Sequence, residues 1–149
     1  MPEGYGVPTT GEGMLSFEVV REGMTAARNY WVATVSPNGR PHARPIWGGW
    51  IDDYLYLEGS PKTRTMRNMT DRGYASVHLE SGDQVVIVEG PIEVVEKMEP
   101  GLFKRLADQM ESKYRDYRPE TGDGMRRLTP KRAFAWTTFP GDATRWTFG

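Results

Sequence analysis

Hydrophobic positions along the chain follow a helical period in two places. Leu15, Val19, Val20, Met24 and Ala27 recur at helical spacing and predict a short amphipathic helix near the start of the chain. A second apolar stripe predicts a helix over 101–117 whose apolar side packs in the core or against another subunit. Its members are Leu102, Phe103, Leu106, Met110, Tyr114 and Tyr117.

Shorter runs, rich in aromatic and β-branched residues, predict strands. These runs cover 29–35, 40–51, 54–58, 74–80, 85–96, 133–139 and 144–148. The turn at 36–39 and the Asp52-Asp53 turn join the first three strands into an antiparallel meander. Gly90-Pro91 predicts a bend that curves the sheet toward closure. About six or seven antiparallel strands with two or three short helices indicate an α+β fold, in which barrel closure removes the sheet edges.

The domain organisation is simple. The 149 residues suit one domain over 1–149, and the first 13 residues, rich in Gly, Pro and Thr, are expected to form an irregular arm. We find no internal repeat, linker or low-complexity tract.

Composition narrows the classes of function. The formal charge of -1 gives no long-range attraction to nucleic acid or to an anionic membrane, so anion binding requires a local cluster of charge. The chain has no cysteine, which excludes disulfides and thiol chemistry. It has no apolar run of the roughly 20 residues that span a membrane, and we expect no secretory signal. We therefore expect a cytoplasmic protein with neither nucleic-acid nor membrane partners.

The segment 60–68 has an unusual charge for a helix start. Ser60 is expected at the N-cap and Pro61 at the first helical position. Lys62, Arg64 and Arg67 follow, although the helix dipole favours acidic residues there. A bound phosphate would resolve this repulsion by accepting backbone N–H groups together with the cationic donors. A solvated basic surface is the alternative.

The second predicted strand has an equally unusual composition. Residues 44–50 combine Pro45, the pair Gly48-Gly49 and two tryptophans, Trp47 and Trp50. Proline cannot donate to a sheet ladder, and paired glycines expose backbone to a close neighbour. Such a strand could lie against a flat heterocycle. It could equally be a bulge at a barrel corner with its tryptophans in the core, and the residues alone leave both possibilities open.

In order and spacing, these pieces resemble the pyridoxamine 5′-phosphate oxidase-like superfamily of FMN-binding and flavin/deazaflavin oxidoreductases. The resemblance covers the chain from about Leu15 to Phe148 and implies a split β-barrel. Its most telling stretches are 30–35, the Pro-Asn-Gly turn, 42–47, the pattern Ser60-x-Lys62-x-Arg64 with Arg67-Asn68, and 143–146.

The resemblance also implies a homodimer with cofactor sites at the interface. Lys62, Arg64 and Asn68 match phosphate-binding positions, and Ser60 and Arg67 belong to the same segment. The strand residues Arg44, Pro45, Ile46 and Trp47 match the strand beneath the isoalloxazine or deazaflavin ring. Trp146 matches a late aromatic position near the site, on the same or the partner subunit.

The activity implied is that of an oxidoreductase using FMN or coenzyme F420 for hydride transfer with a small organic substrate. The cations of this region favour the anionic tail of F420, and FMN stays open. Two alternatives remain: a non-catalytic flavin-binding, stress-related or cofactor-storage protein, and a barrel that binds an apolar ligand without a cofactor.

The sequence identifies neither a catalytic residue nor a metal site. His42 and His78 lie on separate predicted strands without the spacing of a metal pair, and we interpret them as structural or surface residues. True pyridoxamine phosphate oxidases carry an Arg-rich C-terminal segment ending in Pro, whereas this chain has Arg145-Trp146-Thr147-Phe148-Gly149. We therefore do not expect activity on pyridoxamine phosphate itself.

Overall fold

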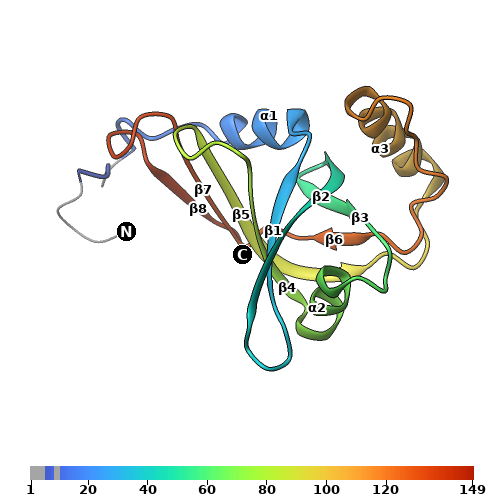
Figure 1. Cartoon of the computed structure of the whole chain (residues 1–149). Coiled ribbons are helices and arrows are strands. Elements are labelled where there is room, and N and C mark those ends of the chain that lie inside the picture. Colours follow the sequence, from blue (N-terminus) through green and yellow to red (C-terminus); the bar gives the residue numbers. More distant parts are fainter. Residues whose placement is uncertain (1–5, 9–10) are drawn as a thin grey trace.

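The computed structural model describes residues 6–8 and 11–149 (Figure 1). Within them lie three helices, α1 (Glu18–Ala26), α2 (Arg64–Arg72) and α3 (Pro100–Lys113). The same residues form eight strands: β1 (Tyr30–Val35), β2 (Pro41–Ile51), β3 (Tyr54–Glu58), β4 (Tyr74–His78), β5 (Val85–Val94), β6 (Arg126–Leu128), β7 (Arg132–Trp136) and β8 (Thr144–Thr147). The predicted arm over 1–13 lies partly outside the described residues, and its described positions contain no helix or strand.

Six of these strands close an antiparallel barrel in the order β4-β1-β2-β3-β6-β5, with β5 returning to β4. β7 pairs with β5 and carries β8 at its outer edge. The predicted α+β split β-barrel is therefore confirmed. The strand that sequence reasoning missed is β6, whose three residues are too few to show a strand period.

The barrel is split because its two long strands change partners midway. β2 pairs with β1 from Pro41 to Ile46 and with β3 from Trp47 onward. β5 pairs with β4 as far as Pro91 and then with β6. The predicted bend at Gly90-Pro91 is thus the point of exchange. A Cβ on Gly90 would lie 1.9 Å from the Thr129 carbonyl oxygen, so only glycine allows this approach.

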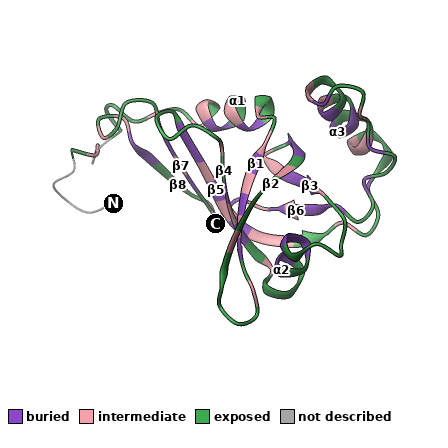
Figure 2. Cartoon of the chain, in the orientation of Figure 1, coloured by how far each residue is buried: buried purple, intermediate pink, exposed green. Residues whose placement is uncertain are grey.

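Two clusters of buried side chains make up the core. Figure 2 marks the buried positions along the ribbon. The larger one fills the barrel and receives Val20 and Met24 from α1 and Met66 and Met69 from α2. The smaller one lies under α3, where part of the predicted apolar stripe is buried as core: Leu106, Met110 and Tyr114. Of the helices in the described residues, none is long and apolar enough to cross a membrane.

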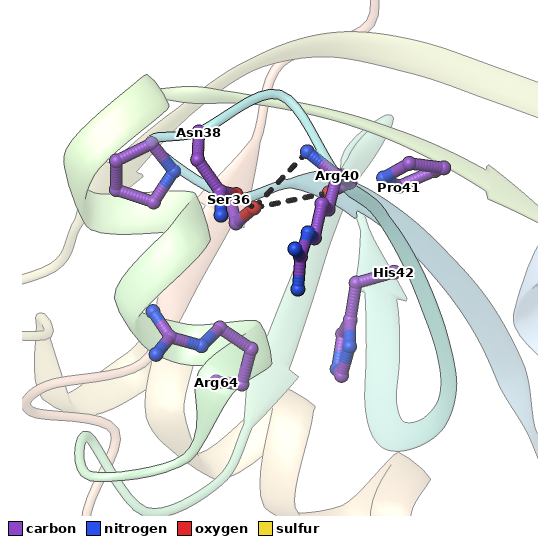
Figure 3. Close-up of a pocket in the computed structure, with 7 residues that line it drawn as sticks. Ser36, Asn38, Arg40, Pro41, His42 and Arg64 are labelled. Atoms are coloured by element: carbon purple, nitrogen blue, oxygen red, sulfur yellow. Dashed lines mark hydrogen bonds between the residues drawn. The ribbon is translucent and has the colours of Figure 1, made fainter.

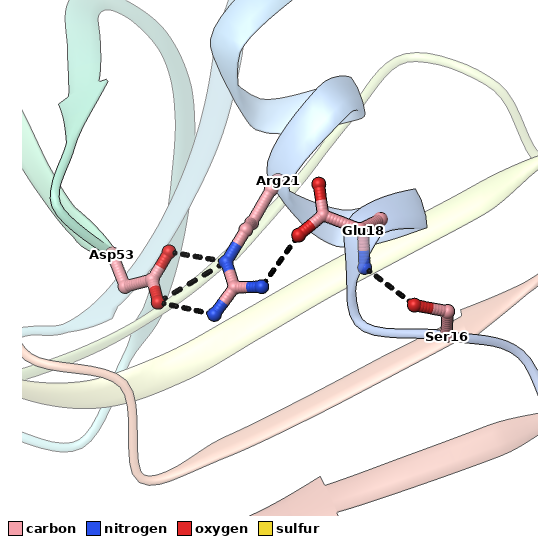
Figure 4. Close-up of polar contacts among 4 residues, drawn as sticks. All are labelled: Ser16, Glu18, Arg21 and Asp53. Atoms are coloured by element: carbon pink, nitrogen blue, oxygen red, sulfur yellow. Dashed lines mark hydrogen bonds and ion pairs between the residues drawn. The ribbon is translucent and has the colours of Figure 1, made fainter.

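The β2–β3 turn connects two helices to the barrel. Asp52 and Asp53 both have positive φ angles, 52° and 64°, which non-glycine residues rarely adopt. Arg21 of α1 binds Asp53, with its Nε 2.9 Å from Oδ1, and also contacts Glu18 (Figure 4). Arg105 of α3 binds both carboxylate oxygens of Asp52 at 2.8 Å. Every charge in this turn is therefore paired.

Candidate functional site

The β1–β2 hairpin brings one side of β2 toward α2. In the turn predicted at 36–39, Gly39 has a positive φ of 83°, and its N–H donates to the Ser36 carbonyl at 2.9 Å to close the turn. Because β2 alternates, His42 and Arg44 project on the same side of the strand as their buried partners on β1. His42 Nε2 lies 3.2 Å from Thr65 Oγ1 of α2.

α2 begins later than predicted. Its N-cap is Thr63, whose hydroxyl accepts from the Met66 N–H at 3.4 Å, and Arg64 is its first residue. Ser60 instead opens a turn in which its carbonyl oxygen accepts from the Thr63 N–H at 3.1 Å. The predicted N-cap at Ser60 is therefore wrong. Threonine is also a favoured N-cap residue, so Thr63 competes with Ser60 for this position, and Pro61 fits a turn as readily as a first helical turn.

The predicted charge conflict is present at this helix start. The first turn of α2 has no acidic residue, and it carries Arg64. Lys62 immediately precedes the N-cap and is exposed, as is Arg67 one turn into the helix. These side chains add positive charge to the positive end of the helix dipole.

A cleft of about 520 Å³ lies between the hairpin and this helix start (Figure 3). It is lined by Ser36, Pro37, Asn38, Arg40, Pro41, His42 and Arg64. Figure 3 shows the side chains of Arg40 and His42, from the hairpin, and of Arg64, from α2, around one space. Of the residues predicted for the site, Arg64 lines this cleft directly.

The electrostatics of the cleft favour an anion. Arg40 and Arg64 line the cleft, and three more cations, Arg44, Lys62 and Arg67, occupy nearby positions of β2, of the segment before α2 and of α2. None of them has a carboxylate within salt-bridge distance among the residues that the structure describes. Burial lowers the pKa of His42, and the charges of Arg44 and Arg64 lower it further. An anion bound here would relieve that repulsion.

Asn68 occupies a different place from the other residues of its segment. It is fully buried, and its Nδ2 donates to the Thr34 hydroxyl at 3.1 Å. Its Oδ1 has no partner among the described residues. The structure therefore places Asn68 between α2 and β1, away from solvent, and its predicted phosphate contact stays a prediction.

The ring-binding strand predicted at 44–47 is accessible on β2. Arg44 and Pro45 are exposed, and Ile46 is half-buried against the barrel core. Trp47 is 37% exposed, and its ring stacks on that of Tyr114, with ring centroids 4.2 Å apart. Trp50 lies in the core, as the bulge alternative expected, whereas Trp47 is at the surface, and ring binding by this strand stays a prediction.

Trp146 is not brought to the cleft within one chain. It lies on β8, where its ring meets that of Phe17 edge-on at 5.4 Å and packs against the barrel core. Its predicted place beside the cofactor therefore stays a prediction.

Sequence reasoning missed His42 as a site residue and gave no role at the site to the C-terminal end of α3. The strand period offered a signal for His42, because residues two apart share a face and Arg44 was already a candidate. The contact of Tyr114 with Trp47 joins residues far apart in the sequence, and no local pattern indicates it. Among the described residues, we find no group of three side chains that could hold a metal ion.

Comparison with known proteins places this geometry in a family. The family model described as pyridoxamine 5′-phosphate oxidase matches residues 17–138. A search of curated proteins gave no match.

Several solved structures share the fold. A conserved hypothetical protein from Mycobacterium tuberculosis is 23% identical with a TM-score of 0.69, and the match covers 87% of this chain and 89% of that one. A heme binding protein from Mycobacterium smegmatis is 19% identical with a TM-score of 0.66, over 87% of this chain and 57% of that one. A protein named F420 reductase is 18% identical with a TM-score of 0.55, over 89% and 98%. Since the family model spans most of the sequence, the chain belongs to the pyridoxamine 5′-phosphate oxidase-like family of split β-barrels.

Proposed function

We propose that the protein binds a flavin-type cofactor, coenzyme F420 or FMN, and uses it to exchange hydride with a small organic substrate. The observation that carries this proposal is the cleft between the β1–β2 hairpin and α2, whose two lining arginines, Arg40 and Arg64, have no carboxylate partner among the described residues. Family membership and the F420 reductase of the same fold support the choice of cofactor.

In this proposal the chain holds the cofactor by its phosphate and orients its ring along β2. Arg64 and Lys62 donate to the phosphate, and Arg44 adds charge beside His42. The exposed stretch from Arg44 to Trp47 lies under the ring. The bound cofactor supplies the hydride chemistry, while the protein supplies binding, orientation and electrostatics.

The number of cations favours F420 over FMN. One phosphate is satisfied by two or three cationic donors, and this region has five of them. The anionic tail of a deazaflavin cofactor would engage the remainder. FMN is the second candidate cofactor for the same cleft.

We also propose a homodimer that completes the site. Several outward positions of β1, β4, β5 and β7 carry apolar side chains that are exposed or half-buried in a single chain, beside the ion pair of Glu89 with Arg132. They include Trp31, Val35, Tyr74, Ile87 and Phe134, of which Val35 is 43% and Tyr74 44% exposed. An apolar surface spread over four neighbouring strands suits a second copy of the chain. Val35→Arg should convert the dimer to monomer in light scattering, and an unchanged mass would contradict this interface.

The test of the proposed function is a spectroscopic titration of the purified protein with FMN, F420 and hemin. We expect F420 or FMN to bind, and the variant with Lys62→Ala and Arg64→Ala to bind it about 100-fold more weakly, because two charge-assisted hydrogen bonds are lost. Lys97→Ala with Lys104→Ala, which removes two exposed cations elsewhere, is the matched control.

Three outcomes separate the alternatives. Binding followed by reoxidation of the reduced cofactor with an added organic acceptor indicates an oxidoreductase. Binding without turnover against any acceptor indicates cofactor storage. Binding of hemin alone would replace the flavin proposal with the function named for the Mycobacterium smegmatis relative.

A further inference from the structure

The second half of β2 does not pair with β1. From Trp47 to Ile51 the strand pairs with β3 on one side, and its backbone groups at Gly48 and Trp50 on the other side face no strand. Unpaired backbone groups in a buried position cost free energy comparable to a lost hydrogen bond. Gly48 and Trp50 are both buried, so these groups require partners.

α3 and the residue after it supply those partners. The Gly48 N–H donates to the Tyr114 hydroxyl at 3.0 Å, and the Gly48 carbonyl accepts from Lys113 Nζ at 2.8 Å. The side-chain amide of Gln109 accepts from the Trp50 N–H at 2.7 Å and donates to the Trp50 carbonyl at 2.9 Å. Three side chains thus replace a missing strand.

Lys113 joins more segments than the other two. Besides Gly48 on β2, its ammonium donates to the Ala27 carbonyl after α1 at 2.9 Å and to the Tyr30 hydroxyl of β1 at 2.8 Å. Tyr30 itself donates to the Met24 carbonyl at 2.6 Å, so it accepts from Lys113. All three ammonium donors are therefore used.

Among the groups in this contact, Lys113 is the one that can change its protonation state near neutral pH. The rings of Tyr30 and Tyr114 lie 4.8 and 5.3 Å from its Nζ, and burial raises the pKa of both hydroxyls. Arg28 donates to the Lys113 carbonyl at 2.8 Å. Lys113 forms no ion pair with a carboxylate of the described part of the chain.

Trp47 stands next to this contact in the chain and in space. Its indole stacks on Tyr114 with an angle of 9° between the rings, and the Arg28 guanidinium lies 5.6 Å from the indole. The ring of Tyr117 meets the indole edge-on, and its hydroxyl donates to Glu58, the residue paired with Trp47 on β3. The direction of Trp47 therefore depends on how α3 is seated on Gly48.

We infer that Lys113 is a positioning residue for the ring end of the site. By holding Gly48 to α1 and β1, it fixes the strand that carries Trp47, the last residue of the proposed ring-binding stretch. This inference rests on the proposed function for the identity of the ligand, but not for the effect on Trp47.

Titration of Lys113 provides a signature that a purely structural contact lacks. Burial lowers the pKa of Lys113 to about 8. A neutral amine has two N–H donors, so above this pH one of the three acceptors loses its hydrogen bond. Ring binding should then weaken as the pH rises through about 8, and this step should be missing in Lys113→Met.

The experiment compares Lys113→Met with Lys104→Met, a replacement of an exposed lysine on the same helix. The affinity for FMN, F420 and inorganic phosphate is measured for both. Lys113→Met loses one charged hydrogen-bonded contact. We therefore expect it to bind FMN or F420, whichever the native protein binds, about tenfold more weakly. Its affinity for phosphate should be unchanged. Lys104→Met should match the native protein throughout.

A second measurement does not depend on the cofactor. The contribution of Trp47 to acrylamide quenching is taken as the difference between each protein and its Trp47→Phe counterpart. We expect quenching of Trp47 to rise about twofold in Lys113→Met, because the stack on Tyr114 loosens. Tyr114→Phe, which removes only the hydroxyl, should also raise the quenching of Trp47. It is the variant to measure if Lys113→Met does not fold.

Unchanged cofactor affinity and unchanged Trp47 quenching in both variants would overturn the inference, even with a lower melting temperature. If the native protein binds no flavin and no deazaflavin, the proposed function fails. The quenching comparison then still decides whether Lys113 positions Trp47.

Discussion

The two halves of β2 differ in whether the polar and charged groups around them have partners. In the first half, from Pro41 to Ile46, the strand is open on the side of α2, and the cations near it have no described carboxylate partner. In the second half, from Trp47 to Ile51, the backbone of Gly48 and Trp50 is satisfied by α3, and the turn that follows has both carboxylates paired.

The first half therefore has the features of a ligand-binding surface, and the second half has those of a structural contact. Satisfied hydrogen bonds and paired charges stabilise the folded chain, whereas gathered like charges destabilise it until a ligand arrives. Local rules of stability are broken at functional sites and obeyed elsewhere. The comparison therefore predicts stability losses from substitutions between Gly48 and Ile51, and binding losses from substitutions in the first half and at Trp47.

The largest effect is expected from Gly48→Ala. A Cβ at this position would lie 2.1 Å from the Tyr56 carbonyl oxygen, which is backbone and cannot move aside. We expect a loss of about 3 kcal/mol or more in the free energy of unfolding, measured by urea denaturation. Gly82→Ala is the matched control, since nothing lies within 4 Å of a Cβ there. A loss below about 1 kcal/mol for Gly48→Ala would contradict the close packing described for the second half.

Much of the fold around these halves could be predicted from the sequence. Alternating apolar residues and strong turns located seven strands, and the strand predicted at 54–58 has the bounds of β3. β6 could not be found, because three residues carry no readable period. The partner exchange of β2 after Ile46 depends on which strands meet in space, and the sequence shows it only indirectly, through Gly48-Gly49.

Less of the site was predictable. The segment 60–68 was located by its charge, yet the start of the helix was misplaced because Ser60 and Thr63 both suit an N-cap. The burial of Asn68 follows from the packing of α2 on β1 and cannot be read from a motif. Lys113 was one of 19 lysines and arginines until the structure placed it beside Gly48.

The second largest effect concerns anion binding in the cleft between the first half of β2 and α2. Inorganic phosphate that binds the folded chain and not the unfolded one stabilises it by mass action, by about 2.7 kcal/mol at a concentration 100 times its Kd. We expect phosphate to raise the melting temperature of the native protein above that in sodium chloride of equal ionic strength. The Lys62→Ala, Arg64→Ala double variant should show no difference between the two salts. An equal phosphate effect in that variant would place the anion elsewhere.

A smaller effect compares a paired arginine with an unpaired one. Arg105→Met removes the bidentate contact with Asp52 and should lower the melting temperature, by far less than Gly48→Ala because both side chains are exposed. Arg64→Met removes a cation from a repulsive cluster and should leave the melting temperature unchanged or slightly raised. Adding 1 M sodium chloride should shrink the Arg105→Met effect by screening. A lower melting temperature for Arg64→Met would show that this arginine stabilises the chain.

The smallest effect is a pH dependence that originates in His42. Because the pKa of His42 in the folded chain lies below its ordinary value of 6.5, the unfolded chain binds the proton more readily. Stability is therefore lost as the pH falls from about 6.5 through the folded pKa, and His42→Asn should remove this loss. The repulsion that lowers this pKa comes partly from Arg44 and Arg64, so an anion between these cations should weaken it.

Sulfate tests this coupling, because its charge stays constant over the range in which His42 titrates, whereas that of phosphate does not. Sulfate affinity should rise by at most about fivefold between pH 8 and pH 5.5 in the native protein, the strength of one exposed ion pair. In His42→Asn the affinity should be independent of pH. A pH dependence that survives this substitution would mean that another group carries the proton, and that the cleft beside the first half of β2 attracts anions without His42.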